Sequence, residues 1–185
     1  VTGNDALLYA RSGKLITNFD STIGKELSQL PDGCYDGEIM GEDFVSLMRQ
    51  AYRKENVETE GTYLALFDYL PSEEWESRTG KLSCRKRYES LSGFLMGGEK
   101  YLQIVPRWTT TTDYAEIKKL HDGFVEEGYE GAMVKNLGAP YKFGRGYEIM
   151  KLKAFHDVDL KIERLLEGTG RHSGKLGSVD RKSVV

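Results

Sequence analysis

Two short segments in the second half of the chain carry charged side chains that could bind a phosphorylated ligand. In the first, Tyr129-Glu130-Gly131-Ala132-Met133-Val134-Lys135, a carboxylate and an ammonium group bracket an apolar run of strand length. A carboxylate can hold Mg²⁺ against substrate phosphates, and a nearby lysine adds positive charge. A surface glutamate, a turn glycine and a buried strand explain this segment alone equally well.

The second segment is Met150-Lys151-Leu152-Lys153. Because residues i and i+2 of a strand point to the same face, Lys151 and Lys153 are expected to lie together. On a buried strand, two ammonium groups are costly unless an anion binds them, which favours a phosphate site. At a sheet edge, a solvated basic face would explain them as well.

Three further segments in the first half of the chain could complete a nucleotide site. They are Arg11-Ser12-Gly13-Lys14, Tyr35-Asp36-Gly37-Glu38 and Leu66-Phe67-Asp68. An aromatic face such as Phe67 can stack on a purine, and the Glu38 carboxylate can accept hydrogen bonds from ribose hydroxyls. Taken singly, each has an ordinary explanation: Phe67 as core, Asp36-Gly37 as a turn, and Arg11 as a solvated side chain.

In this order and at these separations, the five segments resemble the motifs of the covalent nucleotidyltransferases. This superfamily comprises ATP-dependent DNA ligases, RNA ligases and mRNA capping enzymes, and Phe67-Asp68 with the spacing after Glu130 looks most like the DNA ligases. The resemblance implies binding of ATP, held as AMP, and of Mg²⁺. For the nucleotide, it implies that Phe67 contacts adenine, that Glu38 contacts the ribose, and that Lys151 and Lys153 contact the α-phosphate. Lys135 would add positive charge to this nucleotide site. The resemblance further implies that Glu130 binds the divalent metal and that Arg11 contacts the phosphate at the nick.

The function that the resemblance implies is sealing of nicks in duplex DNA through enzyme-AMP and DNA-adenylate intermediates, by a monomer. An RNA ligase or an mRNA capping nucleotidyltransferase is the alternative within the superfamily. A non-catalytic DNA-binding module is the alternative from another class.

Positive charge is concentrated in the last part of the chain. From residue 135 to the C-terminus the chain holds 11 Lys and Arg against 6 Asp and Glu, although the net charge of the whole chain is -3. Such a basic region is compatible with a phosphate-binding surface.

The nucleophile motif of the superfamily, Lys-x-Asp-Gly, has no match in this chain. Leu30, Cys34 and Leu120 stand two residues before the three Asp-Gly pairs. Since the Arg11 segment follows the nucleophile closely in the family, we expect this lysine just upstream of Val1 and no self-adenylation by the chain alone. Tyr147 and Met150 also occupy a strand where many relatives have tryptophan.

The elements that must position these residues indicate an α/β (α+β) fold. Together with the resemblance, they predict an ATP-grasp-like adenylation domain of mixed sheets flanked by helices over residues 1–154, and the beginning of an OB-fold β-barrel over 155–185, with the boundary near Phe155. Expected strands are 6–10, 34–40, 62–70, 101–105, 131–135 and 147–153, and expected helices are 21–30, 44–52, 83–95 and 112–127, with a short one capped by Ser72. A half-exposed alternating strand is expected over 157–163, followed by a Gly-rich basic loop.

Composition narrows the class of protein. Of the 185 residues, 39% are hydrophobic and 30% are charged, which is typical of a globular protein with a core. No apolar run approaches the roughly 20 residues that a membrane helix needs. Cys34 and Cys84 lack the spacing of a disulfide framework or a zinc site. We therefore expect an intracellular protein without membrane contact, cytoplasmic or, in a eukaryote, nuclear.

Overall fold

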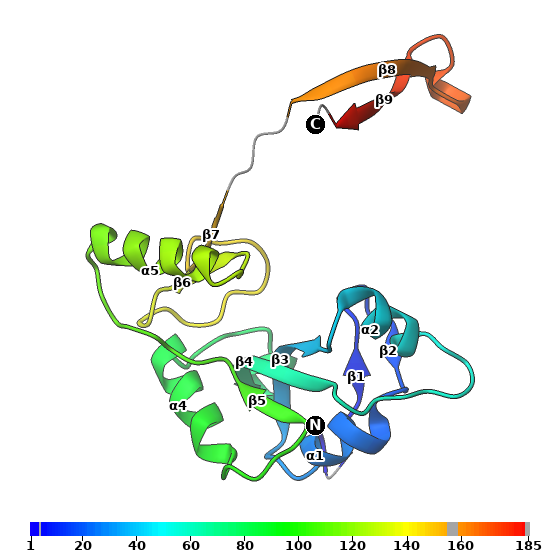
Figure 1. Ribbon diagram of the computed structural model, residues 1–185. Helices are drawn as coiled ribbons and strands as arrows, with labels where there is room; N and C mark the ends of the chain where they lie inside the picture. The colour runs from blue at the N-terminus through cyan, green and yellow to red at the C-terminus, as the bar shows by residue number, and fades with distance from the viewer. Residues whose placement is uncertain (4, 155–158, 184–185) are drawn as a thin grey trace. The chain divides into compact units, whose positions relative to one another are not determined.

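The computed structural model describes residues 1–3, 5–154 and 159–183, which form a mixed α/β fold (Figure 1). The chain divides into two compact units, Val1–Ile117 with Met133–Lys151, and Lys118–Ala132 with Leu152–Val185. The expected domain boundary near Phe155 lies outside the described residues. No helix among the described residues is long and apolar enough to cross a membrane.

A three-stranded sheet forms the centre of the first unit. Strand β3 (Gly33–Met40) pairs antiparallel with β4 (Tyr63–Pro71), and β4 pairs in parallel with β5 (Leu102–Ile104). Helix α4 (Cys84–Phe94) packs on β4 (Figure 1). The expected strands and this helix are confirmed, with ends within two residues of the expected ones. The buried core beneath the sheet comprises Leu8, Phe19, Ile23, Leu27, Leu30, Leu64, Leu66, Tyr69, Leu91 and Leu102.

A β-bulge interrupts the pairing of β3 with β4. Asp36 pairs with Asp68 and Gly37 pairs with Leu66, so Phe67 is the extra residue on β4. Leu66 and Tyr69 both belong to the core. The bulge therefore places both Phe67 and Asp68 between two core residues and returns Tyr69 to the core face of the sheet.

Gly37 makes this close pairing possible. A Cβ atom at Gly37 would lie 2.7 Å from the carbonyl oxygen of Ala65. Asp36-Gly37 is thus not the turn that was its ordinary alternative explanation, and Gly37 is a strand position where only glycine fits without a shift of the partner backbone.

Short elements complete the first unit. Strands β1 (Leu8–Tyr9) and β2 (Leu15–Ile16) form a hairpin around the expected turn. The expected helix 21–30 is a π-helical turn, Asp20–Gly24, followed by α1 (Lys25–Leu27). Helix α2 (Phe44–Ala51) is as expected. Ser72 is the first residue of α3 (Ser72–Glu76) and not its cap, since no side chain caps that helix.

Strands β6 (Gly131–Lys135) and β7 (Ile149–Lys153) form a two-stranded sheet that follows α5 (Tyr114–Glu126). Gly131 has a φ of +149°, and a Cβ there would overlap the carbonyl oxygen of Leu152. Lys151 and Lys153 are exposed and flank the half-buried Leu152, so they do share a face. Of the two alternatives for these lysines, the exposed strand holds, so the cost of burial gives no argument for an anion there.

The C-terminal hairpin pairs β8 (Leu160–Glu167) antiparallel with β9 (Leu176–Ser183) across a short 3₁₀ turn, Gly170–His172. Strand β8 overlaps the strand expected over 157–163. Every described side chain of β8 is exposed, so the expectation of one buried face is wrong within this chain. The described residues contain a hairpin and no closed barrel.

Candidate functional site

Phe67 and Lys135 meet on the face of the central sheet opposite the core. Phe67 is half-buried, and the Lys135 ammonium lies 5.4 Å from its ring centroid. The same ammonium donates a hydrogen bond of 2.8 Å to the Phe67 carbonyl oxygen. The bulge on β4 and the end of β6 therefore bring together an aromatic ring and a cation, as a site for a phosphorylated purine requires.

Glu38 shares this face of the sheet. It pairs across the strands with Ala65, and cross-strand partners project to the same side. Its side chain is exposed. Ala65 and Phe67 alternate with the core residues Leu64 and Leu66, so Glu38 lies beside the β4 position two residues before Phe67, on the same face of the sheet.

A buried ion pair lies directly behind Lys135. Arg87 donates to Asp68 through Nε and Nη2 at 2.7 and 3.0 Å, and both side chains are at most 5% exposed. Burial works against the charge of Arg87, but hydrogen bonds to Asp68 and its negative charge outweigh this and raise the pKa of the guanidinium. Asp68 also lies 3.9 Å from the Lys135 ammonium. The Asp68 carboxylate thus accepts two hydrogen bonds from Arg87 and also lies near Lys135.

Asp36 faces Asp68 across the ladder between β3 and β4. Burial raises the pKa of Asp36, the adjacent Asp68 raises it further, and Lys135 opposes both. Two carboxylates side by side cost energy unless cations compensate them. Lys135 and Arg87 provide that compensation, so the sheet face carries a cluster of two acids and two bases.

Two other predicted site residues of the first unit lie outside the three-stranded sheet. Arg11 is exposed in the turn between β1 and β2, and Lys151 is exposed on β7. Glu130 and Lys153 belong to the second unit and form an ion pair with each other. Two pairs of predicted site residues are in contact in the described part of the chain, Phe67 with Lys135 and Glu130 with Lys153.

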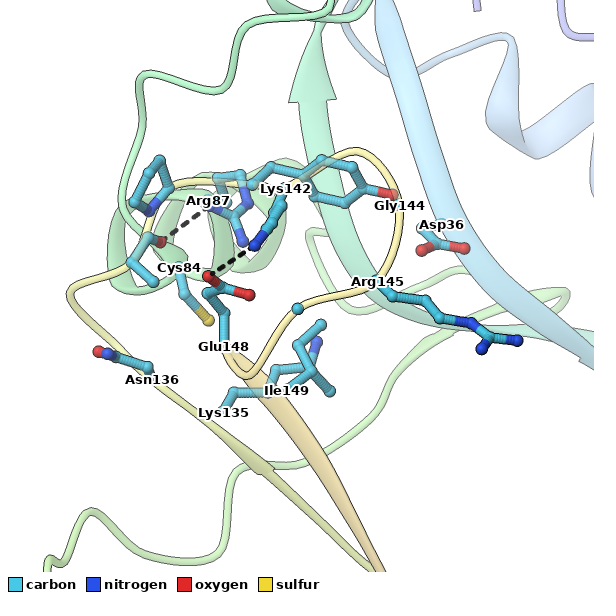
Figure 2. Close-up of a pocket in the computed structure, with 14 residues that line it drawn as sticks. Asp36, Cys84, Arg87, Lys135, Asn136, Lys142, Gly144, Arg145, Glu148 and Ile149 are labelled. Carbon is cyan, nitrogen blue, oxygen red and sulfur yellow. Dashed lines mark hydrogen bonds and ion pairs between the residues drawn. The ribbon is translucent and has the colours of Figure 1, made fainter.

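A cavity of about 400 Å³ opens beside Lys135 (Figure 2). Asp36, Cys84 and Arg87 line it together with the loop of residues 136–148. That loop carries Arg145 and Lys142, which pairs with Glu148 at 3.7 Å. A hydrogen bond of 2.8 Å links the loop to the start of α4, because the backbone N–H of Cys84 donates to the carbonyl oxygen of Ala139. Of the predicted site residues, Lys135 alone lines the cavity.

We assign the candidate site to the sheet face at Phe67 rather than to this cavity, because that face carries both the aromatic ring and Lys135.

Comparison with protein families decides the class. A family model described as "ATP dependent DNA ligase domain" matches residues 1–153, which is most of the chain. The protein belongs to the ATP-dependent DNA ligase family. The predicted mixed α/β fold and the predicted family are both confirmed by this match and by similar solved structures.

Individual DNA ligases match parts of the chain or all of it. A probable DNA ligase of Kineococcus radiotolerans is 33% identical over 103 residues, covering 53% of this chain and 19% of the relative. The solved structure Pmar-Lig_PreS3 superimposes with a TM-score of 0.84 at 28% identity and covers all of this chain, which covers 46% of that structure.

The structure of the ATP-dependent DNA ligase from bacteriophage T7, solved with ATP, superimposes on this chain with a TM-score of 0.64 and 20% sequence identity. The match covers 97% of this chain and 69% of the T7 chain, and it shows that the two share a fold. This chain spans less than half the length of the Kineococcus radiotolerans relative and of Pmar-Lig_PreS3.

Reasoning from the sequence of this DNA ligase chain missed Asp36, Asp68 and Arg87 as members of the site. The sequence does contain a pattern that could have identified Arg87. It lies between Cys84 and Leu91 at helical spacing, and all three side chains are buried on the same face of the helix. A basic residue on the apolar stripe of a helix requires a buried acidic partner. The identity of that partner, 19 residues away, requires the register of β4.

Proposed function

We propose that the chain contributes the nucleotide-binding face of a ligase that seals nicks in duplex DNA, using ATP and passing through enzyme-AMP and DNA-adenylate intermediates. The contact of Phe67 with Lys135 on the open face of the sheet carries the proposal. It offers a stacking surface and a positive charge within one nucleotide's reach. The solved T7 DNA ligase complex with ATP, which shares the fold, supports ATP as the nucleotide.

Each predicted residue has a place in this proposal. Adenine stacks on Phe67, the ribose hydroxyls donate to Glu38, and Lys135 faces the phosphate. Lys151 and Lys153 neutralise the α-phosphate, and Arg11 contacts the phosphate at the nick. Phosphoryl transfer depends mainly on such positioning and charge neutralisation, because the protein need not form covalent bonds in the last step.

Glu130 is the proposed Mg²⁺ ligand. Within the described ranges, no three His, Cys, Asp or Glu side chains gather into a metal-binding group. Mg²⁺ is commonly held by one or two carboxylates, with phosphates and waters completing its coordination. A single exposed carboxylate paired with Lys153 fits that donor set, and the bound ion would neutralise phosphate charge there.

The last step of ligation offers a test that bypasses the nucleophile. In it, the 3′-hydroxyl oxygen bonds to the 5′-phosphorus of the adenylated strand, the phosphoanhydride bond to AMP breaks, AMP leaves with the electron pair, and the hydroxyl proton passes to solvent. This step uses neither ATP nor the lysine of Lys-x-Asp-Gly, a motif that the 185-residue sequence does not contain.

We expect the chain with Mg²⁺ to join a nick carrying a 5′-adenylate, and to leave a nick carrying a 5′-phosphate unjoined when ATP is supplied. Joining of the adenylated nick should fall when Lys151 is replaced by alanine, while the fold is retained. A stable AMP adduct on the chain after incubation with ATP would contradict the predicted lack of self-adenylation. Preference for an adenylated RNA nick over DNA would instead favour an RNA ligase.

A further inference from the structure

The buried pair of Arg87 and Asp68 lies next to Lys135 in a way that bears on nucleotide binding. Lys135 has two acceptors within reach, the Phe67 carbonyl oxygen at 2.8 Å and the Asp68 carboxylate at 3.9 Å. The Lys135 ammonium donates a hydrogen bond to the neutral carbonyl oxygen and lies beyond hydrogen-bond distance of the charged carboxylate. An ammonium group ordinarily prefers a carboxylate to a carbonyl, because the charge-assisted bond is stronger. Something must therefore reduce the attraction of Asp68.

Arg87 provides that reduction. Its guanidinium donates to both carboxylate oxygens of Asp68, at 2.7 and 3.0 Å. Its third nitrogen, Nη1, donates to the Leu82 carbonyl at 2.7 Å, and the guanidinium carbon lies 5.5 Å from the Tyr141 ring centroid. The side chain is 3% exposed, so the ion pair is shielded from water and its geometry is fixed on several sides. Asp68 also accepts a hydrogen bond from the backbone N–H of Tyr69.

We propose that Arg87 is a positioning residue that occupies Asp68 and so keeps the Lys135 ammonium at the Phe67 carbonyl, available for a nucleotide phosphate. Without Arg87, Asp68 is a buried carboxylate that lacks a full counter-ion, and Lys135 is the nearest cation. The ammonium then turns from the Phe67 carbonyl oxygen to Asp68, and the site loses its positive charge for a phosphate while keeping its aromatic surface. This inference rests on the proposed nucleotide site at Phe67.

The test compares AMP with adenosine, which lacks the phosphate, by isothermal titration calorimetry on the 185-residue chain. In Arg87→Met we expect AMP affinity to fall about tenfold or more, the equivalent of ~1.4 kcal/mol, while adenosine affinity stays within about twofold of wild type. Arg85→Met is the matched control, because Arg85 lies two residues away on the same helix with an exposed side chain. It should leave both affinities unchanged.

A rescue variant separates positioning from a general structural role. Asp68→Asn/Arg87→Met removes the carboxylate charge as well, so Lys135 has no stronger acceptor and AMP affinity should return to within about threefold of wild type. Equal losses of AMP and adenosine affinity in Arg87→Met, or no loss of either, would overturn the inference. So would failure of the double variant to restore AMP binding. If Arg87→Met does not fold, Asp68→Asn alone decides: AMP affinity at or above wild type supports the inference, and a tenfold fall overturns it.

A crystal structure of unliganded Arg87→Met tests the inference apart from the proposed function. We expect the Lys135 ammonium within hydrogen-bond distance of Asp68 and no longer bonded to the Phe67 carbonyl. An ammonium that stays on the carbonyl overturns the inference even if nucleotide binds. Wild-type chain that binds neither AMP nor adenosine overturns the proposed function, whereas the position of Lys135 in the variant still decides the inference.

Discussion

Replacing Phe67 with leucine should weaken nucleotide binding without unfolding the site. The substitution keeps an apolar, half-buried side chain and leaves the backbone bulge in place, so the hydrogen bond from Lys135 to the Phe67 carbonyl remains available. Volume-conserving apolar changes of this kind usually cost less than about 1.5 kcal/mol of stability. What leucine removes is the flat face on which a purine can stack.

The magnitude follows from that lost face. Stacking of a base on an aromatic ring contributes about 1–3 kcal/mol, which corresponds to roughly 5- to 150-fold in affinity. The ring also lies 5.4 Å from the Lys135 ammonium, and loss of this cation–π contact adds roughly 0.5–1 kcal/mol to the cost in stability. We therefore expect a fall in AMP affinity within this range and a small fall in the free energy of unfolding.

Isothermal titration with AMP measures the first quantity, and urea unfolding the second. Phe67→Tyr should bind AMP like wild type, because it retains the ring. Tyr63→Leu is the matched control, since it makes the same kind of change on β4 roughly 13 Å away along the strand. The reasoning is refuted if Phe67→Leu binds AMP as tightly as wild type, or if Tyr63→Leu weakens binding equally.

Three further predictions concern neighbouring positions. Gly131→Ala should lower the free energy of unfolding by at least about 2 kcal/mol in a urea titration, since it forces alanine into a φ of +149° and against the Leu152 carbonyl. Burial raises the pKa of Asp36 above 3.8, so the wild type loses stability as pH rises from 3.8 through the folded-state pKa. The stability gained by Asp36→Asn should therefore grow across that pH interval and then level off, and parallel unfolding profiles from pH 3 to 7 would contradict this. Glu130→Gln should change the free energy of unfolding by less than about 1 kcal/mol, because the ion pair of Glu130 with Lys153 is exposed. The same substitution should raise the Mg²⁺ concentration needed to join an adenylated nick. An unchanged Mg²⁺ dependence would argue against Glu130 as the Mg²⁺ ligand.

Local sequence signals predicted the elements that carry the site. The aliphatic and aromatic run before Pro71 predicted β4, and Ser83 predicted the start of α4, where its side chain accepts from the backbone N–H of Lys86. These signals are local, since they depend on side-chain periodicity and on caps within a few residues.

Contacts that depend on register could not be predicted. The bulge at Phe67 arises from two strands separated by more than 20 residues, and it sets which residues after Phe67 return to the core face. The pairing of Arg87 with Asp68 follows from that register. The expected half-burial of β8 was wrong for a related reason, because alternation within a strand does not reveal whether another layer covers it.

The most direct test of the proposed site is a crystal structure of the chain with AMP bound. The account predicts adenine stacked on the Phe67 ring, ribose hydroxyls donating to Glu38, and the phosphate facing the Lys135 ammonium. AMP seated instead in the cavity walled by residues 136–148, with the Phe67 ring uncovered, would contradict it.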